Sequence, residues 1–252
     1  MADWALVLGA SSGFGAATAQ ALAHAGFHIA GMHMDRRETL AAAQVVERNI
    51  QAAGRETIFM NGNAADEVQR AAMLQALAGH QVRVLFHSLA FGSLKPIIGP
   101  DSATQRQIEM TTDVMGHSLI YWARDLVARG LMGHGGRIFA MTSEGSSRAL
   151  SHYGPVSAAK AVLEAHIRQL AVELAPQGIT ANALLAGTTD TPALRKIPGY
   201  EQLLASAAAR NPHRRLTTPE DVAQAVVSLV SPQTAWITGN TIRVDGGEGI
   251  AG

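Results

Sequence analysis

A cluster of three glycines near the N-terminus is the first feature whose residue types and spacing suit chemistry. The stretch LVLGASSGFGAATAQALAHAG, residues 6–26, places Gly9, Gly13 and Gly15 between an apolar run and an alanine-rich segment of helical period. Glycines let a backbone turn sharply and approach a pyrophosphate, while N–H groups at the start of the following helix face the anion. The pattern favours a dinucleotide-binding turn over a purely structural one. The residues expected to contact the cofactor here are Gly9, Ser11, Ser12, Gly13, Phe14 and Gly15.

A charged stretch at the end of the second predicted strand is expected to meet the adenosine end of the dinucleotide. Its sequence, GMHMDRRE, contains His33, Asp35, Arg36 and Arg37. An acidic residue at this point accepts hydrogen bonds from the ribose diol of NAD, whereas arginine favours the 2′-phosphate of NADP. A solvated surface loop is the alternative interpretation of the same residues. Because two adjacent guanidinium groups can pair with one phosphate, we expect NADP(H) rather than NAD(H).

The elements that must position these residues alternate along the chain between short apolar runs and alanine-rich segments of helical period. Such alternation predicts right-handed βαβ crossovers and a parallel sheet covered by helices on both faces. We therefore expect a single α/β domain over residues 1–252, with a Rossmann-like, doubly wound sheet of seven strands. The predicted strands are Trp4–Leu8, His28–His33, Thr57–Met60, Val82–His87, Arg137–Met141, Thr180–Leu184 and Thr241–Val244, and the predicted helices include Ala16–His24, Thr39–Ala53, Asp66–Ala78, Tyr153–Ala175 and Glu220–Val230.

The composition excludes several classes of function. Of the 252 residues, 47% are apolar and 16% are charged, which suits a large buried core. Twenty basic and twenty acidic side chains balance, so no overall charge indicates a nucleic-acid partner or an anionic membrane. The absence of cysteine excludes disulfides and thiolate chemistry. We expect no metal, because no acid joins His24, His28 and His33 at ligand spacing and the other histidines are scattered. The lack of a signal peptide or membrane span favours the cytoplasm.

The stretch SHYGPVSAAKAVLEA, residues 151–165, resembles the short-chain dehydrogenase/reductase family. The resemblance covers essentially the full length, since it includes the glycine turn and the motif VDGG at residues 244–247. In the classical branch of this family the catalytic tyrosine stands four residues before the lysine, a position that Val156 occupies here. Tyr153 and Lys160 instead stand seven residues apart, a spacing typical of the family's enoyl-acyl carrier protein (ACP) reductases.

Three further motifs are similar to those of the enoyl reductase branch. The motif HSLAFG, residues 87–92, replaces the classical N-N-A-G, and Asp113 stands where the classical branch has a catalytic asparagine. The motif NALLAGTTDT, residues 182–191, has Ala-Gly in place of Pro-Gly. The best-known enoyl reductases differ in two ways, because their glycine turn is stretched and Ser143 replaces their second active-site tyrosine. The combination is most similar to the enoyl reductase branch that keeps a classical glycine turn and uses NADPH.

The resemblance implies an enzyme that reduces the C=C bond of an enoyl thioester, with ACP as the expected carrier and a homotetramer as the expected assembly. Tyr153 would stabilise the enolate oxygen, and Lys160 would hold the nicotinamide ribose. Seven residues make almost two helical turns, so these side chains share one helix face. Ser143 has two open interpretations, which are assistance to the substrate oxygen and capping of the strand end. The remaining cofactor contacts implied by the resemblance are Asn63, Ala64, Ser88, Leu89, Ala90, Gly187, Thr188 and Thr191.

Two other functions stay open at this point. A carbonyl reductase of the same family, such as a 3-oxoacyl thioester reductase, is the closest alternative, and Val156 counts against it. A cofactor-binding regulatory protein without turnover is the second, and the intact Tyr153 and Lys160 count against it. The segment Gly187–Pro212 contains no predicted strand. We expect residues 188–212 to form a lid that determines acyl specificity.

Overall fold

Short aliphatic runs form the strands, largely where the sequence predicts them. The computed structural model describes residues 3–251. Its strands are β1 (Trp4–Leu8), β2 (His28–His33), β3 (Thr57–Asn61), β4 (Val82–His87), β5 (Arg137–Met141), β6 (Thr180–Ala186) and β7 (Thr241–Val244). Strands β1 and β5 are buried along their whole length, as strands covered on both faces should be.

The seven strands pair in parallel in the order β3-β2-β1-β4-β5-β6-β7. The chain moves outward from β1 to β3 and then returns to the other side of β1 with β4. The connections that follow β1 and β4 therefore lead to helices on opposite faces of the sheet, and this reversal is where doubly wound folds bind their ligands. The predicted Rossmann-like, doubly wound sheet of seven strands is confirmed.

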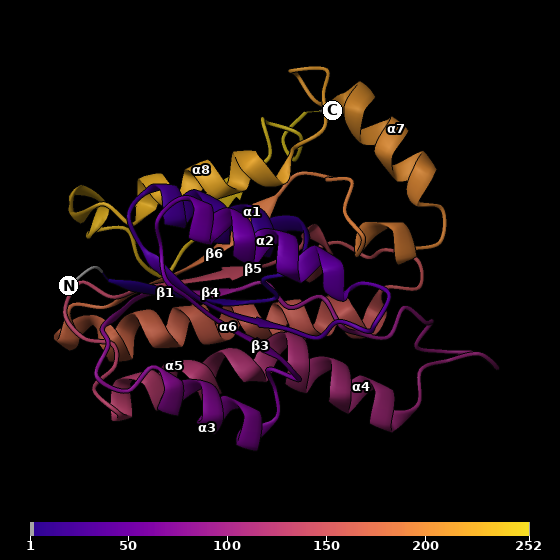
Figure 1. Ribbon diagram of the computed structural model, residues 1–252. Helices are drawn as coiled ribbons and strands as arrows, with labels where there is room; N and C mark the ends of the chain where they lie inside the picture. The colour runs from indigo at the N-terminus through magenta and orange to yellow at the C-terminus, as the bar shows by residue number, and fades with distance from the viewer. Residues whose placement is uncertain (1–2, 252) are drawn as a thin grey trace.

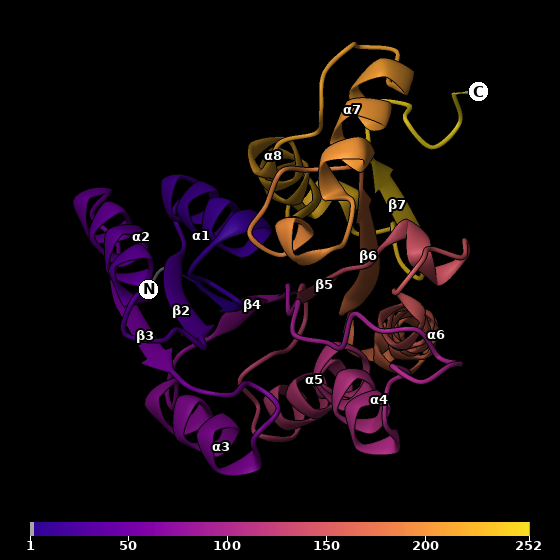
Figure 2. The ribbon, with the colours of Figure 1, turned by 90° about the vertical axis from the view of Figure 1, so that its right-hand side faces the viewer.

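Helices cover both faces of the sheet (Figures 1 and 2). Helices α1 (Gly13–His24), α2 (Leu40–Ala52) and α8 (Pro219–Leu229) lie on one face, and helices α3 (Glu67–Ala76), α4 (Gln105–Thr112), α5 (Ser118–Ala128) and α6 (Gly154–Leu174) lie on the other. Each face has its own apolar core, with Leu22 and Val226 on the first and Trp122 and Leu163 on the second. None of the helices in residues 3–251 is long and apolar enough to cross a membrane.

Three helices lie in segments for which the sequence analysis named no element, and two of them adjoin a π-helical turn. That turn, η1 (Asp113–His117), joins α4 to α5, and π-helical turns are frequent at functional sites. The third helix, α7 (Tyr200–Arg210), belongs to residues 188–212, which also contain the 3₁₀ turn η4 (Leu194–Lys196). Helix α7 stands clear of both helix layers, beyond the edge where the strands end (Figure 1).

Candidate active site

The loops that follow β1, β2 and β4 are tied together at the carboxyl edge of the sheet. Gly9 N and Ala10 N both donate to the carbonyl oxygen of Met32, at 2.8 and 2.9 Å. Ser88 N donates to the carbonyl oxygen of Leu8 at 2.9 Å. The glycine turn therefore lies directly between the ends of β2 and β4.

The glycine turn has the geometry of a cradle that side chains would fill. A Cβ atom on Gly9, whose φ is +92°, would lie 2.5 Å from the carbonyl oxygen of Ser88. A Cβ atom on Gly15 would lie 1.9 Å from the carbonyl oxygen of Gly9. Ser12, the N-cap residue of α1, makes no side-chain capping hydrogen bond to the described residues, and the first turn of α1 contains no acid. The helix N-terminus thus keeps N–H donors for an anion, which fits a dinucleotide pyrophosphate.

In the charged stretch at the end of β2, Asp35 is held by hydrogen bonds, whereas Arg36 and Arg37 are exposed. Asp35 Oδ2 lies 2.9 Å from Nδ1 of the buried His33, and Asp35 N donates to Asn61 Oδ1 at 3.0 Å. Partial burial acts to raise the pKa of Asp35, but hydrogen bonds from Ser11 and Thr39 and the nearby His33 outweigh it and leave the pKa below its ordinary value. The side chains of Arg36 and Arg37 are exposed and form no ion pair within residues 3–251.

Tyr153 and Ser143 meet between the end of β5 and the start of α6. Tyr153 is the N-cap residue of α6, and its ring lies so close to Gly145 that a Cβ atom there would approach it to 2.7 Å. Burial raises the pKa of the Tyr153 phenol, and a hydrogen bond with Ser143 partly opposes that rise. Ser143 Oγ also accepts from Gly145 N at 3.2 Å. Ser143 therefore caps the turn after β5 and faces the phenol at the same time.

Lys160, seven residues further along α6, is a buried cation. Its Nζ donates to the carbonyl oxygen of Met141 at 2.8 Å and to that of Leu89 at 3.4 Å. Burial lowers the pKa of Lys160 to about 8, although the nearby Glu164 carboxylate acts to raise it. Glu164 Oε1 is held by Thr142 Oγ1, which donates at 2.6 Å. The end of β5, the end of β4 and one face of α6 therefore meet at this ammonium group.

His87 is a polar member of the site to which the sequence analysis gave no role. The side chain is fully buried at the end of β4, and its Nε2 lies 2.8 Å from Ser118 Oγ. Ser118 Oγ donates to the carbonyl oxygen of Val114, so Nε2 must be the donor to Ser118. Burial lowers the pKa of His87 to about 3, with a second contribution from Lys160. The ring is neutral, and its Nδ1 has no partner among residues 3–251. The sequence signal that could have identified His87 is a polar residue at the end of an otherwise apolar strand.

The classical tyrosine position is closed by packing. Val156 is 3% exposed and packs with Met115 and Ala159. Gly92 also lies against this side chain, since a Cβ atom there would be 3.0 Å from Val156 Cγ2. Tyr153 is thus the tyrosine that shares the carboxyl edge of the sheet with Lys160.

Comparison with known proteins decides the family. Residues 9–248 match the family model described as enoyl-(acyl carrier protein) reductase. The chain belongs to this family.

The relatives of this family member include both an enoyl reductase and a dehydrogenase. The enoyl-[acyl-carrier-protein] reductase [NADPH] FabI of Staphylococcus aureus is 32% identical over 164 residues, which are 65% of this chain and 63% of that protein. The match therefore spans less than two thirds of FabI. The cis-4-hydroxycyclohexanecarboxylate dehydrogenase of Sinomonas cyclohexanicum is 31% identical over 248 residues, 96% of this chain and 95% of that protein.

A solved structure supports the fold. The enoyl-[acyl-carrier-protein] reductase (NADH) of Aquifex aeolicus superposes with a TM-score of 0.86 at 24% identity, covering 99% of this chain and 97% of that one. The predicted short-chain dehydrogenase/reductase family and its enoyl reductase-like branch are confirmed. The chain is an oxidoreductase of this family, and its relatives are named for NADPH or NADH.

The other predicted contacts of this family member lie in three segments, which follow β3, β4 and β6. Asn63 and Ala64 shape the turn before α3, because Asn63 Oδ1 accepts from Ala65 N at 3.0 Å and the Ala64 carbonyl accepts from Trp122 Nε1 at 2.8 Å. Ser88, Leu89 and Ala90 follow β4, beside the glycine turn. Gly187, Thr188 and Thr191 follow β6, and Thr191 Cγ2 would lie 3.5 Å from a Cβ atom on Gly13. The structure thus brings the start of the lid onto the glycine turn.

Two further features lie outside this group of residues. Asp113 Oδ1 accepts from Tyr121 on α5 at 3.0 Å. A cavity of about 420 Å³ lies beside the end of β7, lined by residues that include His213, Arg215 and Arg243, and it contains none of the predicted site residues. The candidate site lies instead at the loop after β4, which contacts Lys160 through the Leu89 carbonyl and the glycine turn through Ser88. No group of three or more histidines and acids suited to a metal occurs within residues 3–251.

Proposed function

We propose that the protein reduces the C=C bond of an enoyl thioester with a nicotinamide cofactor, which supplies the hydride when bound. The single observation that supports this most is the Tyr153–Lys160 pair on α6, together with the buried Val156 at the classical tyrosine position. Hydride addition at the β carbon places negative charge on the thioester oxygen, and protonation at the α carbon completes the reduction. Tyr153 donates its phenol proton as a hydrogen bond to that oxygen and stabilises the enolate.

The protonation states of the two side chains suit this division of work. Because burial raises the pKa of Tyr153, the phenol remains a hydrogen-bond donor at neutral pH. A pKa of about 8 leaves Lys160 charged at neutral pH. Two of its three N–H bonds are directed to the carbonyl oxygens of Met141 and Leu89, and the third is left for a ribose hydroxyl of the cofactor.

The remaining parts of the cofactor would be held along the carboxyl edge of the sheet. Gly9, Gly13 and Gly15 would cradle the pyrophosphate, and Thr191 would cover it from the lid. We propose NADP(H) as the preferred cofactor, because Arg36 and Arg37 are exposed beside the adenosine end while the Asp35 carboxylate is engaged by His33. An NAD(H) enzyme that reads the ribose through Asp35 is the alternative.

The carrier, the assembly and the location complete the proposal. The S. aureus relative is named for an ACP substrate, which supports ACP as the carrier. We propose a homotetramer, as the family resemblance implies, with α6 packing across an interface that would cover the exposed Val172. Residues 188–212 would act as the lid that selects the acyl chain. We propose the cytoplasm as the location.

A carbonyl reductase or dehydrogenase is the second candidate, and two observations favour it. The relative that matches this chain over 96% of its length is named as a dehydrogenase of a hydroxy acid. The family resemblance implies that Ser143 matches the catalytic serine of the classical branch, and Ser143 interacts with the Tyr153 phenol. An assay with both kinds of substrate is therefore needed to distinguish an enoyl reductase from a carbonyl reductase or dehydrogenase.

The deciding experiment follows NADPH and NADH consumption with crotonyl and acetoacetyl thioesters, on both CoA and ACP. We expect the crotonyl substrate to be reduced, and Tyr153→Phe to lower kcat about 100-fold or more because it removes an oxyanion donor. Tyr121→Phe is the matched control, since the Tyr121 hydroxyl on α5 donates to Asp113 in η1 and its loss should leave kcat within about twofold.

Each other outcome assigns a different function. Turnover of the acetoacetyl substrate alone makes the protein a carbonyl reductase with an unusual tyrosine spacing. Cofactor binding without turnover of either thioester rejects both acyl thioester activities and leaves another substrate or a regulatory role.

A further inference from the structure

Glu248 is a buried carboxylate in the C-terminal turn, outside every motif used above. It is 4% exposed and follows β7 by only a few residues. Its Oε2 accepts from Thr188 N at 3.0 Å, and its Oε1 accepts from Thr188 Oγ1 at 2.7 Å and from Arg210 Nη2 at 3.2 Å. A buried carboxylate needs such partners because its desolvation is costly.

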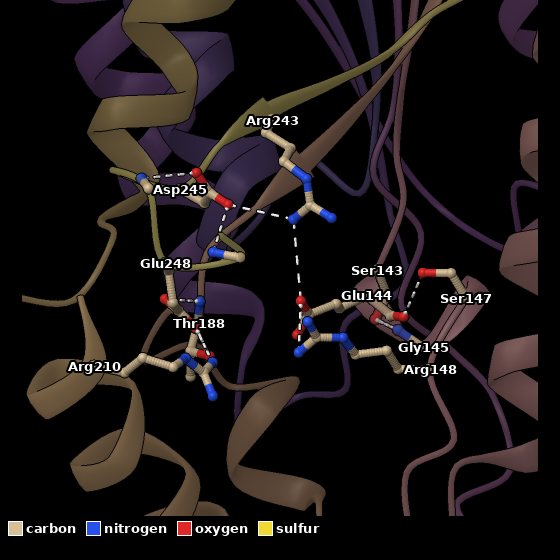
Figure 3. A network of polar contacts seen from close by, with 12 residues as sticks. Ser143, Glu144, Gly145, Ser147, Arg148, Thr188, Arg210, Arg243, Asp245 and Glu248 are labelled. Atoms are coloured by element: carbon tan, nitrogen blue, oxygen red, sulfur yellow. Dashed lines mark hydrogen bonds and ion pairs between the residues drawn. The ribbon is translucent and has the colours of Figure 1, made fainter. Parts of the chain in front are cut away.

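The three hydrogen bonds join the two ends of the lid. Thr188 is the first residue of the segment 188–212, and Arg210 is the last residue of α7 within it. Figure 3 shows Glu248 between these two side chains. The approach also depends on Gly187, because a Cβ atom there would lie 2.8 Å from Glu248 Oε2. The Glu248 carboxylate thus contacts the lid both at its first residue and at the end of its helix α7.

The turn that bears Glu248 is itself held rigidly. Asp245 accepts from Gly247 N and from Gly249 N, both at 3.0 Å, and its carbonyl accepts from Asn211 Nδ2 at 2.9 Å. Arg243 links the same turn to the loop after Ser143, since its Nη1 lies 3.4 Å from Asp245 and 4.0 Å from Glu144 (Figure 3). Glu248 is therefore a fixed point against which the lid is placed.

The start of the lid connects this fixed point to the glycine turn. Both donors of Thr188 are directed to Glu248, and three residues later Thr191 lies against Gly13. Any outward movement of Thr188 would draw Thr191 away from the place where the proposed pyrophosphate lies.

We propose that Glu248 is a positioning residue that holds residues 188–191 over the glycine turn and thereby sets the affinity for the dinucleotide. The inference rests on the proposed binding of a nicotinamide cofactor and is independent of which substrate is reduced. Glu248 acts through Thr188 and Arg210 and touches no reacting atom.

The test measures two properties that need no turnover. The first is the Kd of NADPH and of NADH by fluorescence titration. The second is the rate of tryptic cleavage after Arg195 and Lys196 in the lid, followed by mass spectrometry, since the Arg195 side chain is 62% exposed. For Glu248→Gln we expect about tenfold weaker cofactor binding and about tenfold faster cleavage, because charge-assisted hydrogen bonds are lost.

Two other variants keep the test decisive. Asp125→Asn removes a carboxylate that pairs with Arg70 at 2.7 Å on the opposite helix layer, and both measurements should stay within about twofold of the wild type. Arg210→Met removes only the partner on α7, whose side chain is 32% exposed, so it should fold even if Glu248→Gln does not. It should accelerate cleavage and weaken cofactor binding in the same direction, by about threefold.

The outcomes separate this inference from the proposed function. If a folded Glu248→Gln or Arg210→Met variant binds the cofactor as the wild type does, the positioning role is wrong. If cofactor binding weakens while the lid is cleaved at the wild-type rate, Glu248 does not hold the lid and the inference also fails. If both change as expected but no enoyl thioester is reduced, the inference stands and the proposed substrate is rejected.

Discussion

Lys160 should lose its charge within the pH range in which the protein can be assayed. A pKa of about 8 means that the ammonium form makes up about 90% of the protein at pH 7 and about 10% at pH 9. If the cofactor ribose requires the charged form, kcat/KM for the cofactor should fall about tenfold between these two pH values. This ratio reports the protonation state of the free protein, to which the pKa of about 8 applies.

Glu164→Gln provides the matched variant, because Glu164 is the carboxylate that raises the pKa of Lys160. Glutamine keeps the volume of the side chain and an oxygen that can accept from Thr142. Without the negative charge, Lys160 should lose its proton more easily, so the alkaline fall in kcat/KM should move to lower pH. The comparison of the two pH profiles isolates Lys160 from other titrating groups.

The free energy of unfolding should change with pH in the opposite direction to activity, and this difference distinguishes titration of Lys160 from unfolding. The folded pKa of about 8 lies below the ordinary lysine value of 10.5, so between these pH values the unfolded chain binds more protons. The contribution of Lys160 to the free energy of unfolding therefore rises with pH across that window while activity falls. The reasoning is refuted if kcat/KM stays flat to pH 10, or if Glu164→Gln moves the fall to higher pH.

Two further variants test the cofactor site. Gly15→Ala places a Cβ atom 1.9 Å from the carbonyl oxygen of Gly9, so we expect the Kd of the cofactor, measured by titration, to rise about 10- to 100-fold. Gly133→Ala is the control, because a Cβ atom there meets nothing within 4 Å and should leave the Kd unchanged. Equal affinities of the two variants would show that the turn does not bind the cofactor. The double variant Arg36→Ala/Arg37→Ala should raise KM for NADPH about tenfold and leave KM for NADH unchanged, because only the 2′-phosphate needs the guanidinium groups. A selective loss of activity with NADH would instead show that the site binds NAD(H).

The positions of the strands could be predicted from the sequence because their signal is local. A run such as Trp4–Leu8 is apolar at every position, which is what a strand buried on both faces requires. The bounds of five of the seven strands were predicted as the structure has them, and β3 and β6 extend by one and two residues. Helices α4 and α5 were not among the predicted elements, and the π-helical turn between them interrupts the regular helical period on which such predictions depend.

The candidate site could be predicted in its residue types but not in its electrostatics. The spacing of Tyr153 and Lys160 places both on one helix face in any helix. Their altered pKa values arise from burial against β4, β5 and the turn at Gly145, and no local pattern encodes that burial. His87 is neutral for the same reason, although histidine is ordinarily the side chain that titrates near neutral pH.

The sequence by itself determined the family, the alternation of strands and helices, and the glycine turn, because each depends on residues close together in the chain. Only the tertiary structure decided that Val156 is closed off by packing, that Asp35 is engaged by His33 while Arg36 and Arg37 are exposed, and that Glu248 binds Thr188. The last contact joins residues 60 positions apart, and its strength depends on exclusion from water. Burial and long-range pairing are properties of the folded chain as a whole, so they appear only when the sheet and its loops are assembled.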